Sequence, residues 1–272
     1  MTFGAQQLPA AIVLTFDNLG EASELERGSW PAHAPLGRHP SVVEVLPALL
    51  DELDAVGLTA TFFVEAINCE LYPDALAGIV ARGHELGVHG WRHERWEALP
   101  AARERELLAR SRAAFAALGF DARGFRPPGG ALTAHSPELL AASGITWCSP
   151  EGGGVGVRDG LAYVPFAWPD VDAYHLLGQF EQLRVRRGDG ARPLEPTALL
   201  ERMSARLSGG ALGQRVGVLI LHPFLMLDPG WFAGVRALLG ALAALARERR
   251  AWVVAGGRFA GWLRGTATAV PA

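Results

Sequence analysis

The sequence predicts an α/β protein that folds as a (β/α) barrel, in a single domain spanning residues 1–272. Strand-like and helix-like segments alternate along most of the chain, in roughly seven or eight β/α units, and this favours a barrel over an open sheet. The length of 272 residues suits one such unit, since α/β barrels use about 250 residues. Half of the residues are hydrophobic and 19% are charged, so a large core is available.

The predicted strands are short apolar runs, often β-branched, that lie between turn residues. They cover residues 11–16, 59–64, 85–89, 145–148, 161–167, 216–221 and 251–255, and one more short strand runs into Arg126. Residues 216–221 (VGVLIL) form the clearest buried strand.

The predicted helices follow these strands in the chain. They cover residues 41–56, 73–82, 101–118, 137–142, 196–207 and 231–250. In the first of them, Ser41 and Glu44 have the spacing of a capping box. Pro47 is expected to kink its first turns, and Gly57 is expected to end it.

Three segments are too long or too rich in turn residues to be simple connections: residues 18–40, 150–160 and 188–196. Long loops beside a site commonly shape the substrate pocket, and we expect this of the first two. The third is interpreted as surface decoration.

Composition restricts the partners and the compartment. The net charge of −3 argues against a nucleic-acid or anionic-membrane partner. Cys69 and Cys148 lie far apart in the sequence, which suggests a reducing compartment or buried thiols rather than a disulfide framework. The most apolar stretch, residues 237–246, is too short to cross a bilayer, and no export signal is visible, so we expect a cytoplasmic protein. Apolar helix faces would allow a homo-oligomer.

Four polar residues lie at the ends of predicted strands: Asp17, His89, Arg126 and His222. Parallel strands bring their carboxyl ends to a common edge, so these side chains are expected to meet there. His93 follows His89 at a spacing that allows both imidazoles to bind one ion. Such groups hydrolyse bonds beside a metal or with an acid/base pair.

Each of these residues also has a simpler interpretation. Asp17 could cap a helix, although a carboxylate that ends an apolar strand needs partners if it is buried and ionised. His222 could satisfy a polar contact in the core, and Arg126 could belong to a surface turn. The stiff Arg-Pro-Pro-Gly turn instead suits an arginine that orients a carboxylate. The ordered set is more specific than any of its members.

In this order the motifs resemble those of the polysaccharide deacetylase family, also called carbohydrate esterase family four. The resemblance rests on Thr-Phe-Asp-Asn at 15–18, His-Gly-Trp-Arg-His at 89–93, Arg-Pro-Pro-Gly at 126–129 and Leu-Ile-Leu-His at 219–222. It implies a distorted (β/α) barrel with about seven strands that removes acyl groups from N-acylated sugars. His-Pro at 222–223 and the segment at 168–174 are similar to the intracellular branch with allantoinase-like members, alongside peptidoglycan-deacetylase-like ones.

By this resemblance, Asp17 is the general base, and Arg126 orients it. His89 and His93 hold a divalent metal, with zinc as the expected ion, and His222 is the general acid.

The chain departs from the family pattern in two places. The family's third metal ligand is an aspartate, and here that position holds Asn18, whose neutral amide is a poorer zinc ligand. Three alternatives follow. Asn18 is the third ligand and metal affinity is lower, Asp17 or Glu21 takes its place as a carboxylate ligand, or the site works without a metal.

The second departure concerns the acidic segment that steadies the acid histidine. Glu151, Asp170 and Asp172 are the candidates for this work. Asp170 and Asp172 rank first because they lie between Trp168 and Tyr174, and these four residues are the predicted substrate-binding set.

The sequence therefore predicts a hydrolase of a non-peptide carbon–nitrogen bond, by metal-assisted N-deacetylation of a sugar or small amide, with a role in carbohydrate metabolism. One alternative is a metal-independent amidohydrolase that acts on a cyclic amide or ureide. Another is a barrel that binds a glycan or metabolite without catalysis.

Overall fold

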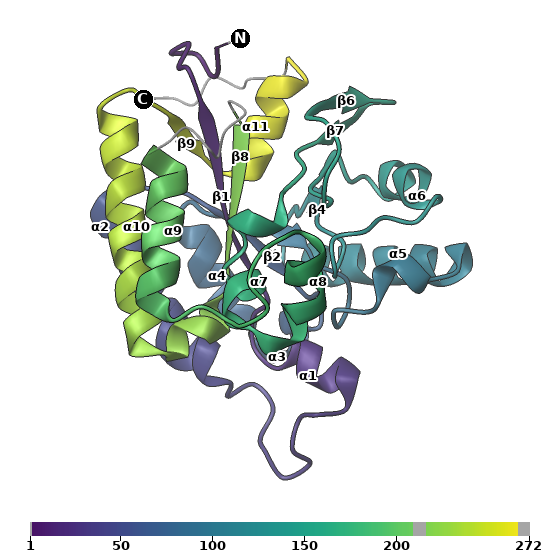
Figure 1. The fold of residues 1–272 in the computed structure, drawn as a ribbon. Helices are drawn as coiled ribbons and strands as arrows, with labels where there is room; N and C mark the ends of the chain where they lie inside the picture. Colours follow the sequence, from purple (N-terminus) through teal and green to yellow (C-terminus); the bar gives the residue numbers. More distant parts are fainter. Residues whose placement is uncertain (1, 209–215, 266–272) are drawn as a thin grey trace.

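The computed structural model of the chain describes residues 2–208 and 216–265. A curled sheet lies at the centre of the molecule, and helices surround it (Figure 1). The predicted α/β fold, a distorted (β/α) barrel, is confirmed.

Nine strands form this sheet within the described residues, and every pairing except that of β6 with β7 is parallel. In sheet order they are β6 (Gly156–Arg158), β7 (Leu161–Tyr163), β5 (Trp147–Cys148), β4 (Gly124–Phe125), β3 (Glu85–Val88), β2 (Thr61–Val64), β1 (Ala11–Asp17) and β8 (Val216–Leu221), while β9 (Trp252–Val254) pairs with β1. The expected number of about seven strands is therefore too low. The strand that no pattern predicted, β6, is a largely exposed hairpin strand without an apolar run.

The barrel is distorted because β6 and β8, at the two ends of the strand order, are not paired with each other among the described residues. At the outer edge of β8, Ile220 instead forms a single parallel bridge with Val171. On the other side of β8, β1 pairs with it over residues 11–16. The opposite edge of β1 pairs with β9 at its start and with β2 at its end.

The helices confirm the six predicted ones to within a few residues, and the structure adds shorter ones. The α-helices are α1 (Ala22–Arg27), α2 (Leu46–Val56), α3 (Asn68–Leu71), α4 (Pro73–Ala81), α5 (Ala101–Ala117), α6 (Ser136–Ala142), α7 (Asp172–Leu176), α8 (Glu181–Arg186), α9 (Pro196–Ser208), α10 (Pro229–Arg247) and α11 (Gly256–Leu263). Single turns are η1 (Ser41–Val45), η2 (Trp96–Ala98), η3 (Trp168–Asp170), η4 (Gly178–Phe180) and η5 (Pro223–Leu227).

The start of the helix at residue 41 differs from the expectation. The capping box is absent, because the Ser41 hydroxyl pairs with Nδ1 of His39 at 2.7 Å and accepts a hydrogen bond from the backbone of Gly20. Before Pro47, which has no N–H to donate, residues 41–45 are wound as a π-helix. Gly57 ends α2 with a φ of 67°, as predicted.

Side chains of β1 alternate between two cores. Ile12, Leu14 and Phe16 pack outward among the helices, whereas Ala11 and Val13 belong to the cluster inside the barrel. This two-residue period is that of an extended strand. The positions that continue the inner row carry the polar groups of the site.

Glycines in the strands make room for large inner side chains. A Cβ added to Gly124 would lie 2.5 Å from the ring of Trp147, and one added to Gly87 would lie 2.6 Å from the ring of Phe63. Both rings belong to the cluster inside the barrel, where they meet edge to face at 5.3 Å. The inner core therefore depends on small residues in β3 and β4.

One helix of the described chain, α10, is long and apolar enough to cross a membrane by length and composition. Its buried side chains include Trp231, Val235 and Leu239, and it packs against α9, α2 and β9. Near its middle, Arg236 forms an exposed ion pair with Glu52 at 2.7 Å. The apolar residues of α10 are thus used in the core.

We expect Gly124→Ala to lower the free energy of unfolding by about 1–3 kcal/mol, because the added methyl group overpacks the ring of Trp147. Gly78→Ala is the matched control: it lies within α4, where nothing is near an added Cβ, and should raise stability by about 0.5–1 kcal/mol. Urea unfolding followed by circular dichroism measures both. Changes of the same sign would contradict this account of the core.

Candidate active site

Five polar residues meet at one edge of the sheet because each ends or directly follows a strand. They are Asp17, Glu65, His89, Arg126 and His222, from β1, β2, β3, β4 and β8. The parallel ladder continues past the strands: the backbone N–H of His89 donates to Val64, and that of Arg126 donates to Val88. All five side chains are buried and continue the inner rows of their strands.

Arg126 holds Asp17 in a fully buried ion pair. One guanidinium nitrogen donates to Oδ1 of Asp17 at 2.6 Å and to the hydroxyl of Thr15 at 2.8 Å. The other terminal nitrogen donates to the hydroxyl of Ser149 at 2.8 Å, and the guanidinium lies 4.2 Å from the ring centre of Phe63. Burial lowers the pKa of Arg126, and the charge of Asp17 opposes this change. Oδ1 of Asp17 is therefore fixed in place, while Oδ2 lies 4.0 Å from Nε2 of His89.

The two imidazoles of His89 and His93 lie next to each other, with ring centres 5.0 Å apart. Nδ1–H of His89 donates to the backbone carbonyl of Arg126 at 2.8 Å, so its Nε2 keeps a free lone pair. Burial lowers the pKa of each histidine to about 3. Both rings are therefore neutral, which is the form that binds metal ions.

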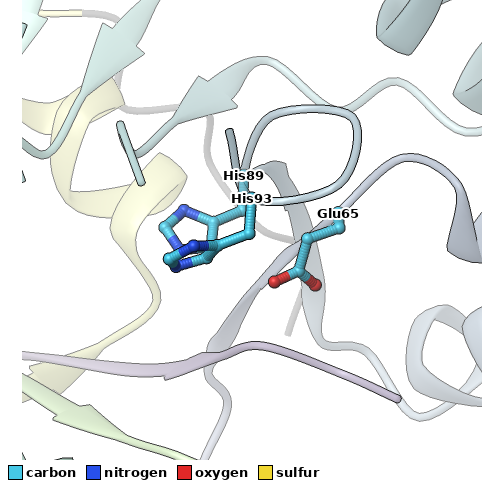
Figure 2. Close-up of side chains that lie close together, drawn as sticks. All are labelled: Glu65, His89 and His93. Atoms are coloured by element: carbon cyan, nitrogen blue, oxygen red, sulfur yellow. The ribbon is translucent and has the colours of Figure 1, made fainter. Parts of the chain in front are cut away.

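Glu65 brings a carboxylate to this pair of histidines. Figure 2 shows its carboxylate turned toward the two rings, and one ligand atom of each residue lies within 4.8 Å of the others. Oε2 of Glu65 accepts hydrogen bonds from the backbone N–H of Leu19 and the side-chain amide of Asn68. Oε1 is buried without a hydrogen-bond partner, and burial raises the pKa of Glu65 to about 8.

These residues fit a divalent metal. Two imidazoles and one carboxylate are the protein ligands of zinc sites that keep a coordination position open. A cation would also provide the missing partner of Oε1 of Glu65. Asn18, the ligand expected from the sequence, lines the same cavity with a left-handed φ of 59°. With a metal bound, Glu65 would supply the carboxylate that position 18 lacks.

The loop that joins the two histidines is strained at His93, which has a φ of 75°, whereas Gly90, with a φ of 74°, adopts this conformation without strain. The buried carboxylate of Glu94 accepts hydrogen bonds from the backbone N–H groups of Trp91 at 2.9 Å and Arg92 at 3.0 Å. A Cβ at Gly90 would lie 2.6 Å from this carboxylate. Glu94 thus fixes the loop that sets the position of His93.

His222 is bound by the carboxylate of Asp172. Nδ1–H of His222 donates to Oδ1 at 2.5 Å, and its backbone N–H donates to Oδ2 at 2.9 Å. The indole of Trp231 also donates to Oδ2. Burial by itself lowers the pKa of His222, but the charge and hydrogen bond of Asp172 outweigh it, and the pKa is raised. Nε2 of His222 is left for a substrate.

A cavity of about 620 Å³ contains this site. Its lining includes the five residues that the sequence was expected to bring together: Asp17, His89, His93, Arg126 and His222. A volume of this size suits a small molecule or a few sugar units.

The predicted substrate-binding residues are divided between the cavity and its support. Trp168 lines the cavity. Tyr174 is fully buried behind it and donates to Asp189 at 2.6 Å. Asp170 lies outside the cavity lining and is paired with Arg206 at 2.7 Å, and Asp172 contacts His222 rather than the cavity.

Sequence reasoning missed Glu65 and Glu94. Glu65 directly follows the strand TFFV, in the position that His89 occupies after β3. The rule that identified the strand-end residues could therefore have found it. No comparable pattern identifies Glu94, because its role depends on the loop conformation.

The protein is an α/β barrel whose acidic and imidazole groups lie at the carboxyl ends of its parallel strands. This is where α/β barrel enzymes have their active sites. The family model described as polysaccharide deacetylase matches residues 5–148. The chain belongs to the polysaccharide deacetylase family. The matched region includes Asp17, both histidines of the pair and Arg126, but not His222.

Curated proteins match shorter segments. Chitin deacetylase 1 of Saccharomyces cerevisiae is 34% identical over 90 residues, which are 32% of this chain and 29% of that protein. Peptidoglycan deacetylase of Helicobacter pylori is 35% identical over 66 residues, 24% of this chain and 22% of that protein. The chain thus aligns with less than a third of each relative.

Solved structures match over nearly the whole chain. A Mycobacterium smegmatis protein described among the polysaccharide deacetylases has a TM-score of 0.78 and 25% identity, covering 97% of this chain and 93% of that one. The structure of Puue allantoinase has a TM-score of 0.74 at 15% identity, covering 98% and 94%. The second likeness concerns the fold alone.

We expect Glu94→Ala to weaken zinc binding by about 10- to 100-fold, because the loop that positions His93 loses two hydrogen bonds. Competition with a chromogenic chelator measures this affinity. Glu97→Ala is the control, since Glu97 also lines the cavity but pairs with exposed Arg95. Equal affinities of the two variants would rule out this role of Glu94.

Proposed function

We propose that this protein hydrolyses a non-peptide carbon–nitrogen bond, by metal-assisted N-deacylation of an amino sugar or a small amide. One observation carries the proposal: Asp17 and His222 line the same cavity from the adjacent strands β1 and β8, and each is held by one charged partner. A base and an acid on either side of a bound amide are what this hydrolysis needs.

The chemistry follows from these contacts. Asp17, held by Arg126, takes a proton from the attacking water as the oxygen–carbon bond forms. His222, protonated and held by Asp172, gives a proton to the leaving nitrogen as the carbon–nitrogen bond breaks. Glu65, His89 and His93 would hold the divalent metal, with zinc as the expected ion, and when bound it supplies Lewis-acid polarisation of the substrate carbonyl.

The alternative is a metal-independent hydrolase of a cyclic amide or ureide. The presence of Asn18, in place of a carboxylate, favours it. The fully buried Glu65 argues for the metal-assisted reaction, because it restores a carboxylate to the pair of histidines.

We expect Asp17→Asn to lower kcat by at least about 100-fold without unfolding the protein, because an amide cannot accept the proton of water but can still accept a hydrogen bond from Arg126. Release of amine from acetylated amino sugars and small acetamides measures turnover, and circular dichroism checks the fold. Undiminished turnover in this variant would exclude Asp17 as the base. Activity that persists in wild-type protein stripped of metal would favour the alternative.

We expect Asp172→Asn to move the alkaline limb of the pH profile of kcat/KM to lower pH. Asp172 raises the pKa of His222, so its loss allows His222 to deprotonate at lower pH, and the proton donor disappears earlier as pH rises. Asp170→Asn is the matched control, since Asp170 pairs with Arg206 and lies outside the cavity lining. An unchanged alkaline limb in Asp172→Asn would argue against His222 as the acid.

A further inference from the structure

Residues 19–40, called here the α1 segment, form one side of the cavity. After α1 the chain leaves the body of the molecule as an extended loop (Figure 1). The members of the segment that line the cavity are Gly20, Ser23, Glu24, Glu26, Arg27 and His39. The base, the acid and the group of expected metal ligands all lie outside it. The α1 segment therefore surrounds a substrate with polar groups without carrying the reacting ones.

Glu21 connects the two ends of the α1 segment. Its Oε1 accepts a hydrogen bond from the backbone N–H of Gly37 at 2.7 Å. Its backbone carbonyl accepts from the N–H groups of Glu24 at 3.0 Å and Leu25 at 2.9 Å, in the first turn of α1. Glu21 itself is fully buried and lies outside the cavity lining. One residue thus contacts both the start of α1 and the point where the loop returns.

Tyr72, which lies between α3 and α4, connects Glu21 to the barrel. Its hydroxyl donates to Oε2 of Glu21 and accepts from the backbone N–H of His39 at 2.8 Å. Its ring packs against Gly20, where φ is 63° and an added Cβ would lie 2.6 Å from the ring. Both ends of the α1 segment are therefore held against the same side chain.

The carboxylate of Glu21 is buried without a cation beside it. Within residues 2–208 and 216–265 it forms no ion pair, and uncharged donors bind both of its oxygens. Burial of a carboxylate is unfavourable unless hydrogen bonds satisfy it. Hydrogen bonds to a carboxylate are also about twice as strong as those between neutral groups. Glu21 therefore favours the one arrangement of the α1 segment that supplies these donors.

The same contacts remove Glu21 from the metal site, although the sequence offers it as a carboxylate ligand. Its two oxygens are bound by Gly37 and Tyr72. In the part of the chain that the structure describes, the side chains placed to hold a metal are Glu65, His89 and His93. A role for Glu21 must therefore be sought in the position of the α1 segment.

We propose that Glu21 is a positioning residue that sets the affinity for the substrate, because through Gly37 and Tyr72 it holds the α1 segment at the side of the cavity. Loss of this hold removes contacts that the substrate makes equally in the ground state and the transition state. Such a loss raises KM and leaves kcat nearly unchanged. The kinetic part of the inference rests on the proposed function, whereas the hold on the segment does not.

Glu21→Gln and Tyr72→Phe test this inference. An amide nitrogen cannot accept a hydrogen bond from the hydroxyl of Tyr72, and phenylalanine has no hydroxyl to donate. For both variants we expect KM to rise by about 3- to 10-fold, the effect of one or two hydrogen bonds, while kcat changes by less than about twofold. Release of amine from acetylated amino sugars and small acetamides measures both constants, and competition with a chromogenic chelator should show unchanged zinc affinity.

Trypsin gives a second measurement that needs no substrate. Arg27 and Arg38 are exposed residues of the α1 segment, and we expect faster cleavage after both in the two variants, followed by mass spectrometry. Glu85→Gln is the matched control. Glu85 also accepts from two backbone N–H groups and a hydroxyl, but it lies at the amino end of β3, away from the cavity. It should lower stability without changing KM or this cleavage.

Lost zinc affinity in Glu21→Gln would make Glu21 a metal ligand and overturn the inference. A fall in kcat at unchanged KM, or equal effects in Glu85→Gln, would also overturn it. A lower melting temperature with unchanged KM and cleavage would do the same, since a merely structural role gives that result. If Glu21→Gln does not fold by circular dichroism, Tyr72→Phe decides. If the wild-type protein releases no amine from any compound, the proposed function fails, and tryptic cleavage alone decides whether Glu21 holds the segment.

Discussion

The two-residue period of parallel strands governs the whole arrangement. Along β1 the inner positions run from Ala11 and Val13, which fill the barrel, to Thr15 and Asp17, which are polar. The same alternation carries β8 from Ile220 to His222. The apolar part of each inner row therefore builds the core, and its last member faces the cavity. A shift in register by one residue would turn every such group outward.

Arg126 connects most of the groups at the centre. Its side chain binds Asp17, Thr15 and Ser149, and its backbone carbonyl fixes the tautomer of His89. Removing either partner of a buried ion pair lowers the free energy of unfolding by about 3–5 kcal/mol, because the remaining charge is buried without a counter-charge or water. The ion pair therefore constrains both the fold and the protonation states of the site. Loss of a charge at either residue is therefore expected to lower stability as well as to change the chemistry of the site.

Sequence patterns predicted the parts of the molecule that depend on local rules. The strands β1 and β8, at whose ends Asp17 and His222 lie, are apolar runs, and the placement of these ends follows from parallel pairing. Contacts set by tertiary packing could not be predicted: the sequence offers Glu151, Asp170 and Asp172 as partners of His222, and only the fold selects Asp172, which precedes His222 by 50 residues. Tyr174 lies in the core on the short helix α7, which follows the 3-10 turn η3. The five residues of α7 are too few for a hydrophobic periodicity that would show which side chains are buried.

The pairing of β1 with β8 has a consequence for biosynthesis. Thr15 and Leu219, which are joined by a hydrogen bond in these strands, are separated by 204 residues. During translation, β1 therefore leaves the ribosome long before β8, with which it forms its longest pairing, is synthesised. Until β8 is available, one edge of the apolar strand β1 is unpaired. Unpaired strand edges make incompletely folded chains prone to associate with one another. Because 204 residues separate the two paired positions, the pairing of β1 with β8 is expected to be a late and slow step in folding.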